Sequence, residues 1–275
     1  AKYYAQAQAP WFSYDRGGDE VADGIELFAQ NGAFAGKKVG VVGVVNEQSL
    51  VKDVVVPALQ RRGVTPVQTA ILDASLRDPA AVAQRTDAII RQLQAAGADT
   101  IVVVGGMGQA FPVQLEKTGY RPRLLFTNLS TAEIYTGDNA QHDRGVLTNA
   151  AALGPLIRWD EPDIRRCVAT VEAAVPTLRD KLYTDARTLP AGSPTPQVAV
   201  ETACRALTLF TGIATKAGRD LTYASFQKAG FTLGPLRIAS YVDPADYSRD
   251  TPHGAIPPRT YTYDPEANKF QLSFS

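Results

Sequence analysis

A repeated unit spans Lys37 to Asn128, in which a short apolar run is followed by a helix-forming segment and then by the next apolar run. The runs are rich in Val, Ile and Leu, and they lie at Val39 to Val45, Val67 to Leu72, Ile101 to Val104 and Leu124 to Thr127. None of them alternates cleanly with polar residues. Strands that are apolar on both sides are typical of parallel sheets covered by helices on both faces. The repeat therefore predicts an α/β fold with a doubly wound parallel sheet.

The segments between the runs carry signals of helix ends. Asp78 and Pro79 provide an N-cap and a first-turn proline, and Gly97 stands where a left-handed cap would end that helix. A helix is also expected from Ser49 to Arg62, with a kink or a late start at Pro57. Further expected elements are helices at Asp19 to Gln30 and Gln109 to Thr118, a short helix at Thr131 to Tyr135, a fifth strand at Gly145 to Asn149, and long helices beginning at Pro162 and Pro196.

Ligands of a doubly wound sheet bind outside the carboxyl ends of its strands. Small or polar residues follow three of the predicted strands, and we take them as candidate ligand-binding residues: Asn46, Glu47, Gln48, Gly106, Met107, Asn128 and Ser130. Glycine lets the backbone approach a ligand closely, and Met107 offers an adaptable apolar wall. Glu47 can face a ligand amine or remain a solvated loop charge. Turn formation and helix capping are the alternative roles for the whole set.

Four sequence blocks occur in a characteristic order: GKKVGVVGVVNEQ from Gly36, QRRGV from Gln60, LQAAGADTIVVVGG from Leu93 and LEKTGYRPRLLFTN from Leu115. Together they resemble the second lobe of type I periplasmic-binding proteins. The nearest branch is the leucine/isoleucine/valine-binding type that serves ABC importers. The resemblance covers most of the chain from about Gly24 onward.

The resemblance implies an extracytoplasmic solute-binding protein, periplasmic or at the cell surface. Such a protein binds a small polar or amphipathic molecule, amino-acid-like or a small organic acid, between two lobes by hinge closure. The expected partners are this ligand and an importer permease, and a lipid anchor on a segment before residue 1 is compatible with this. Neither a cofactor nor enzymatic activity is expected. The alternative is a ligand-sensing domain of a receptor or regulator with the same fold.

The resemblance also predicts a domain organisation. Residues 1–33 are expected to be a remnant of the first lobe and the hinge, and 34–155 the second lobe. Residues 156–236 supply helices that pack towards the first lobe, and 237–275 return to the second lobe with a terminal hairpin. The first lobe is therefore expected to be incomplete, as in a fragment or a processed form, unless a partner or another segment supplies the rest. Two long helices would then have little sheet to pack on, and would expose a large apolar face.

Composition and motifs argue against several other functions. The 28 Lys and Arg residues balance the 28 Asp and Glu residues, so there is no electrostatic case for nucleic acid or for an anionic membrane surface. No apolar run is expected to be long enough to span a bilayer. The glycines at 40–43 and 105–108 do not form a G-x-G-x-x-G fingerprint, and both the G-x-S-x-G elbow and the phosphate loop are missing. These absences weigh against a nucleotide-dependent enzyme.

Histidine and cysteine offer little catalytic or metal-binding chemistry. His142 and His253 stand in polar, turn-like contexts, and we expect both to be solvated loop residues. Cys167 and Cys204 are too far apart in sequence for a CxxC pair. They form either one disulfide between neighbouring helices or two buried free thiols. Export of the protein, as the resemblance implies, favours the disulfide.

Overall fold

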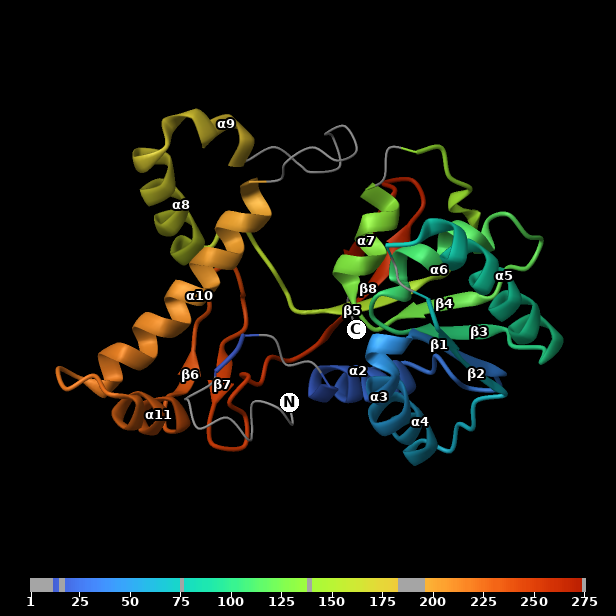
Figure 1. Cartoon of the computed structure of the whole chain (residues 1–275), viewed down its shortest axis with the longest axis horizontal. Coiled ribbons are helices and arrows are strands. Elements are labelled where there is room, and N and C mark those ends of the chain that lie inside the picture. Colours follow the sequence, from blue (N-terminus) through green and yellow to red (C-terminus); the bar gives the residue numbers. More distant parts are fainter. Residues whose placement is uncertain (1–11, 15–17, 75–76, 138–139, 183–195, 274–275) are drawn as a thin grey trace. The chain divides into compact units, whose positions relative to one another are not determined.

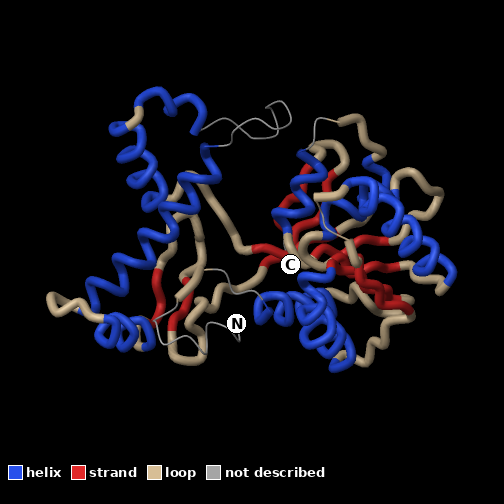
Figure 2. Tube along the Cα trace, in the orientation of Figure 1, coloured by secondary structure: helices blue, strands red, loops and turns tan. Residues whose placement is uncertain are grey.

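The apolar runs form strands of one sheet in the computed structural model, which describes residues 12–14, 18–74, 77–137, 140–182 and 196–273. The sheet has seven strands in the order β2-β1-β3-β4-β5-β8-β9. The strands are drawn in red in Figure 2. Their bounds are β1 Val39–Val44, β2 Gln68–Leu72, β3 Thr100–Val103, β4 Arg123–Phe126, β5 Ala151–Gly154, β8 Arg259–Asp264 and β9 Lys269–Leu272. Strands β1 to β5 pair in parallel, whereas β8 and β9 add as an antiparallel hairpin. The predicted parallel sheet and terminal hairpin are both confirmed.

Helices cover both faces of this sheet (Figure 1). One face carries α2 (Gly18–Gln30), α3 (Gln48–Leu50) and α4 (Val56–Arg61), and the other carries α5 (Pro79–Ala95), α6 (Met107–Leu115) and α7 (Leu129–Gly137). Successive residues of a strand point to opposite faces. Val102 accordingly belongs to the core cluster under α2 and α4, while Ile101 and Val103 belong to the cluster under α5, α6 and α7. The non-alternating strands are apolar because both of their sides are buried.

Helix α5 begins and ends as its capping residues predict. The Asp78 carboxylate accepts a hydrogen bond from the Ala81 amide at 3.1 Å, and Gly97 has a φ of 71° just after the helix. The predicted apolar stripe is buried throughout; it consists of Val82, Thr86, Ile89, Ile90 and Leu93. Local capping and core burial therefore agree in this helix.

Pro57 distorts its helix instead of delaying its start. A π-helical segment (Val51–Val55) joins α3 to α4, with the Val56 amide donating to the Val51 carbonyl. Pro57 then lies in the first turn of α4. Because proline has no amide hydrogen and crowds the preceding turn, a wider turn immediately before it accommodates the ring.

The predicted strand at Gly145 to Asn149 is wrong. A 3-10 turn occupies Arg144–Leu147, and the fifth strand begins only at Ala151. The Asp143 carboxylate accepts a hydrogen bond from the Gly145 amide at 2.9 Å, which fixes the turn, and Asn149 adopts a φ of 60°. Side-chain capping thus competes successfully with the extended conformation here.

The chain divides into two compact units: unit 1 (Ala1–Gly17 and Pro155–Pro257) and unit 2 (Gly18–Gly154 and Pro258–Ser275). Relative to the expected domain organisation, α2 groups with the sheet unit because it buries Val21, Ile25 and Phe28 there. Residues 1–11 of the expected first-lobe remnant lie outside the described residues. Phe12 packs in unit 1 against Phe226 and Phe231, at ring-centroid distances of 6.1 and 5.5 Å.

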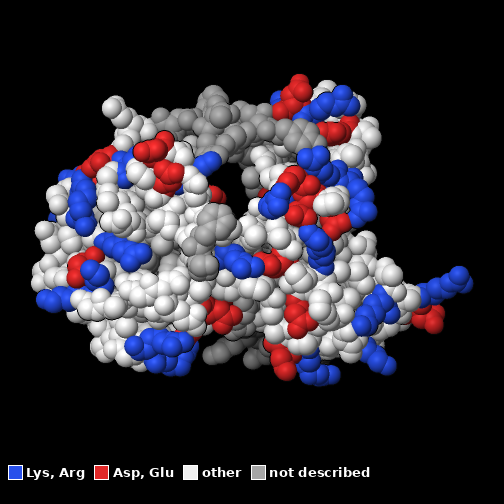
Figure 3. Space-filling view, turned by 180° about the vertical axis from the view of Figure 1, so that it is seen from behind, with Lys and Arg blue, Asp and Glu red and all other residues white. Residues whose placement is uncertain are grey.

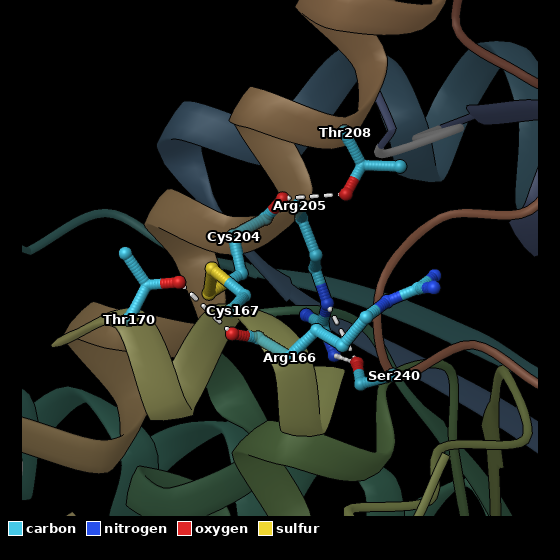
Figure 4. The surroundings of a disulfide bond; sticks show 7 residues. All are labelled: Arg166, Cys167, Thr170, Cys204, Arg205, Thr208 and Ser240. Atoms are coloured by element: carbon cyan, nitrogen blue, oxygen red, sulfur yellow. Dashed lines mark hydrogen bonds between the residues drawn. A yellow bond between two sulfur atoms is a disulfide. The ribbon is translucent and has the colours of Figure 1, made fainter. Parts of the chain in front are cut away.

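Unit 1 consists mainly of helices. Its elements are α8 (Pro162–Ala174), η4 (Pro176–Leu178), α9 (Arg179–Leu182), α10 (Pro196–Ala217) and α11 (Tyr223–Phe231), with the short strands β6 (Gly234–Leu236) and β7 (Ala245–Tyr247). A disulfide between Cys167 on α8 and Cys204 on α10, with a sulfur–sulfur distance of 1.99 Å, ties the two long helices together (Figure 4). The disulfide prediction is confirmed.

Helix α10 exposes apolar side chains at several positions along its length. Val198, Leu207 and Phe210 are 54%, 56% and 51% exposed. Val198 lies on the opposite side of the helix from Leu207, and the Phe210 ring contacts the Phe226 ring at a centroid distance of 5.6 Å, so these side chains do not form one continuous unpartnered apolar face. By length and composition alone α10 could cross a membrane, with 22% of that stretch buried, which corrects the expectation that no such run exists. Glu201 and Arg205 near its middle pair with each other and hydrogen-bond Ser240, and this network fastens α10 to the segment of unit 1 around Ser240.

Candidate functional site

The strand order creates a switch point beside β1. Strand β2 lies on one side of β1 and β3 lies on the other. The connection from β1 to β2 therefore runs in one direction along the sheet, and the connection from β2 to β3 runs back past β1. A crevice opens at the carboxyl ends of the strands where such a reversal occurs, and ligands of doubly wound sheets bind there. In unit 2 this places the candidate site at the turns that follow β1 and β3.

Glu47 bridges these two turns. It lies in the 3-10 turn Val45–Glu47 after β1, and both of its carboxylate oxygens accept from the Gly106 amide, at 3.0 and 3.2 Å. Gly105 has a φ of 48°, and a Cβ added there would lie 2.1 Å from the Glu47 Oε1 atom. Only glycine satisfies both the backbone conformation and this close approach. The sequence around β3 is therefore shaped to accept the Glu47 carboxylate.

The turn after β4 joins the same network. The Gly105 amide donates to the Thr127 hydroxyl at 3.1 Å, and a Cβ added to Gly108 would lie 2.2 Å from the Thr131 hydroxyl oxygen. The turns that follow three neighbouring strands are thus held together by side-chain contacts. Thr127, Thr131 and Gly105 were absent from the residues chosen from the sequence. Their signal was the same one that marked the chosen set, namely polar or small residues directly after a strand.

The structure sorts the predicted residues into three groups. Glu47, Gln48 and Gly106 are partly exposed beside the switch point, and Asn46 is exposed. Asn128 and Ser130 are exposed after β4, where the Asn128 side chain accepts from the Thr131 amide at 3.3 Å and so caps α7. The remaining residue, Met107, has a different environment.

Met107 belongs to the core and not to the candidate site. Its side chain is fully buried in the cluster that contains Phe111 and Leu115. These three residues recur every four positions, which is the spacing of a buried helix stripe. The predicted apolar wall is therefore corrected: Met107 anchors the start of α6 beneath the site.

The electrostatics of the site centre on Glu47. Burial raises the pKa of its carboxyl, and the hydrogen bond from the Gly106 amide opposes that rise. Within the described chain, neither Lys nor Arg forms an ion pair with Glu47. Elsewhere the two signs of charge are mixed, as Figure 3 shows for one face of the molecule. The site therefore offers a half-buried, unneutralised carboxylate among uncharged polar groups.

Replacing Glu47 with Gln is expected to flatten the pH dependence of unit 2 stability just above the ordinary pKa of glutamate. An acid whose pKa is raised on folding binds more protons in the native state, so wild-type stability falls as the pH rises through that interval. Gln keeps an acceptor for the Gly106 amide but does not titrate. Urea unfolding followed by circular dichroism between acidic and neutral pH tests this, and parallel curves for the two proteins would contradict it.

A second polar cluster lies at the other end of α6. The Glu116 carboxylate accepts from the Tyr135 hydroxyl at 2.9 Å and from the Asp143 amide at 3.2 Å, and contacts the His142 Nδ1 atom at 3.0 Å. The His142 side chain is 7% exposed and packs on the Tyr135 ring, so the expectation of a solvated histidine is wrong. His253 is partly exposed.

The cluster around Glu116 stabilises the fold through hydrogen bonds. Burial, followed by the nearby Glu116, raises the pKa of Tyr135, which therefore remains a neutral hydrogen-bond donor. In the described part of the chain, no group of three or more His, Cys, Asp or Glu residues is arranged to hold a metal ion.

Comparison with known proteins identifies the fold. No protein-family model and no curated protein sequence matches the chain. Among solved structures, a branched-chain amino acid ABC transporter protein from Thermus thermophilus with bound valine matches with a TM-score of 0.61 and 14% identity over 97% of this chain and 65% of that one. An extracellular ligand-binding receptor from Rhodopseudomonas palustris gives 0.59 and 14% over 93% and 68%. A fatty acid ABC transporter substrate-binding protein from Thermomonospora curvata gives 0.61 and 12% over 93% and 61%.

These structures are type I periplasmic-binding proteins, and the similarity extends over most of this chain. The fold that the sequence blocks implied is therefore confirmed. The chain spans between 61% and 68% of the length of these three structures.

Proposed function

We propose that this chain, which has the fold of type I periplasmic-binding proteins, is the ligand-binding part of an extracytoplasmic solute-binding protein for an ABC importer. The observation that carries the proposal is the polar, partly exposed edge at the switch point, where Glu47 and Gly106 connect the turns after β1 and β3. That edge is where a sheet of this topology binds ligands. It offers hydrogen-bonding groups, and among its described residues no nucleophile is in contact with a base, which favours binding over catalysis.

The ligand is a small polar or amphipathic molecule, amino-acid-like or a small organic acid. The site supplies the Asn46 and Gln48 side chains, the Glu47 carboxylate and the backbone near Gly106. One structure of similar fold is described with bound valine, and another is described as a fatty acid ABC transporter substrate-binding protein. Both descriptions support a small amphipathic ligand. The Cys167–Cys204 disulfide supports an oxidising, extracytoplasmic location.

Hinge closure is the proposed mechanism. A ligand shifts an equilibrium between open and closed arrangements only through contacts that differ between them. Binding at the switch-point edge of unit 2 supplies one half of those contacts, and the importer permease recognises the closed form.

A ligand-sensing domain of a receptor or regulator is the second candidate function. It is favoured by the similarity to extracellular ligand-binding receptors. Co-purification distinguishes the two functions: recovery of the chain with an importer permease supports the first, and recovery with a signalling protein supports the second.

Substituting both Asn46 and Gln48 with Ala is expected to weaken ligand binding about tenfold to a hundredfold, because each side chain loses a hydrogen bond to a desolvated ligand. A thermal-shift screen of amino acids, amides and small organic acids identifies the ligand, and calorimetry measures affinity. Gln94→Ala, an exposed change near the carboxyl end of α5, is the control and is expected to bind normally. Equal affinity for all three proteins would exclude this edge as the site.

A further inference from the structure

We infer that Arg205 is a positioning residue of the hinge, meaning the connections by which the chain passes between units 1 and 2. Arg205 fixes Ser240 and Tyr241, which contact the connection after Gly154 and share a core cluster with the connection after Pro257. The inference rests on the proposed function, because it names the group that limits the freedom of the proposed hinge. Its test needs no ligand and is therefore independent of the binding experiment.

The connection after Gly154 is paired with Ser240 and Tyr241 almost as soon as it enters unit 1. Ile157 forms an antiparallel bridge to Tyr241, and the Arg158 amide donates to the Ser240 carbonyl at 2.8 Å. Hinges are short segments whose backbone angles absorb the movement between two compact units. The point where this connection becomes part of unit 1 is therefore set by Ser240 and Tyr241.

The connection after Pro257 starts from the same core. Ile256 and Tyr241 are 4% and 3% exposed, and both belong to one buried cluster of unit 1. Close-packed side chains have little free volume, so a displacement of one of them is transmitted to the others. A shift of Tyr241 therefore affects both connections at once.

Arg205 holds these two residues from helix α10. Its Nε atom and one terminal nitrogen donate to the Ser240 hydroxyl at 3.1 and 2.9 Å (Figure 4), and that hydroxyl donates to the Glu201 carboxylate at 2.8 Å. The guanidinium carbon also lies 4.4 Å from the centroid of the Tyr241 ring. A planar guanidinium can bind an oxygen through several donors while it stacks on an aromatic face, which an ammonium group cannot do.

The backbone at Ser240 shows why the hydroxyl matters. Ser240 has a φ of 70° and is 1% exposed, in a turn closed by the Tyr241 amide, which donates to the Ile238 carbonyl at 3.0 Å. Glycine usually fills a turn position with positive φ, and another residue persists there only when surrounding contacts hold it. A serine in place of glycine costs conformational energy but supplies the hydroxyl that Arg205 and Glu201 share.

The test measures how widely the distance between the two units varies in the protein without ligand. Spin labels are attached to Gln94→Cys in unit 2 and to Thr215→Cys in unit 1, two exposed positions, while the native disulfide stays oxidised. Double electron–electron resonance gives the distribution of distances between the labels. Hydrogen exchange of the Arg158 amide reports separately on the connection itself.

Two variants disturb the network, and a third is their control. Ser240→Ala removes the shared hydroxyl, and Arg205→Lys keeps a positive charge beside Glu201 but loses the planar group. Thr211→Ala removes an exposed hydroxyl of the same helix, whose hydrogen bonds go to carbonyls within α10. Circular dichroism verifies that the labelled proteins are folded, and if one network variant does not fold, the other decides the test.

Both network variants are expected to widen the distance distribution about twofold and to accelerate exchange of the Arg158 amide about tenfold. Thr211→Ala is expected to change neither. Faster exchange with an unchanged distribution would overturn the inference, because the network would then be a merely structural contact. Unchanged exchange in a folded network variant would also overturn it. Either result leaves the proposed function intact, since ligand binding is measured in a separate experiment.

Discussion

Reduction of the Cys167–Cys204 disulfide is expected to lower the free energy of unfolding of unit 1 by roughly 4 kcal/mol. The two cysteines are separated by 37 positions, and the chain-entropy model assigns about this stabilisation to closing a loop of that length. The effect is large relative to the stability of a typical domain. It is confined to unit 1, because α8 and α10 both lie there.

The position of tryptophan makes this measurement selective. The chain has two tryptophans, Trp11 and Trp159, and Trp159 packs against the cluster that contains Cys204. In a Trp11→Phe background, Trp159 fluorescence reports on unit 1 during urea unfolding with and without dithiothreitol. The double variant Cys167→Ala/Cys204→Ala is the control, since its unfolding should not respond to reductant. An unchanged midpoint for the reduced protein would show that the disulfide does not stabilise unit 1.

The Glu116→Ala substitution is expected to destabilise unit 2 by about 3 kcal/mol. It removes the carboxylate that accepts from the Tyr135 hydroxyl and the Asp143 amide and that contacts His142. The Tyr135 hydroxyl keeps only a longer contact to the Asp143 carbonyl at 3.3 Å, and a buried donor that loses its acceptor costs roughly 1–3 kcal/mol. The Glu116 side chain is only 14% exposed, so water replaces the lost oxygens poorly.

Two matched variants separate hydrogen bonding from simple loss of a side chain. Glu116→Gln keeps an acceptor in place and is expected to lose less stability than Glu116→Ala, whereas Tyr135→Phe removes one donor and is expected to cost about 1 kcal/mol. Circular dichroism follows unfolding, and amide exchange at Arg144–Leu147 should accelerate first in Glu116→Ala. A loss below about 0.5 kcal/mol in Glu116→Ala would show that the cluster is merely a surface contact.

The sequence predicted what depends on periodicity and local capping. The buried strands, the α5 stripe from Val82 to Leu93 and the Asp78 cap all depend on residues close in sequence, so short patterns suffice to find them. The strand expected at Gly145 to Asn149 failed because the Asp143 side chain stabilises a turn that composition does not reveal.

The candidate site was predicted only in outline. The predicted parallel topology indicated the edge of the sheet where the site lies. The Glu47–Gly106 contact, however, joins residues 59 positions apart, and no local sequence pattern encodes it. The same limit hid the burial of His142, whose partner Glu116 lies 26 positions away. Met107 was different, because its spacing with Phe111 and Leu115 already indicated a core position.

The sheet of unit 2 draws its last two strands from beyond unit 1, and this sets a preferred order of folding. Gly154 of β5 pairs with Arg259 of β8, so the sheet closes a loop that contains all of the chain between them. Within unit 1, Ile157 bridges to Tyr241 and the Val242 amide donates to the Leu156 carbonyl at 3.0 Å. Once these contacts form, the effective loop shortens from about 100 residues to about 20, which lowers the closure cost by roughly 1.4 kcal/mol. Nucleation of unit 1 is therefore expected to accelerate docking of the β8–β9 hairpin onto β5.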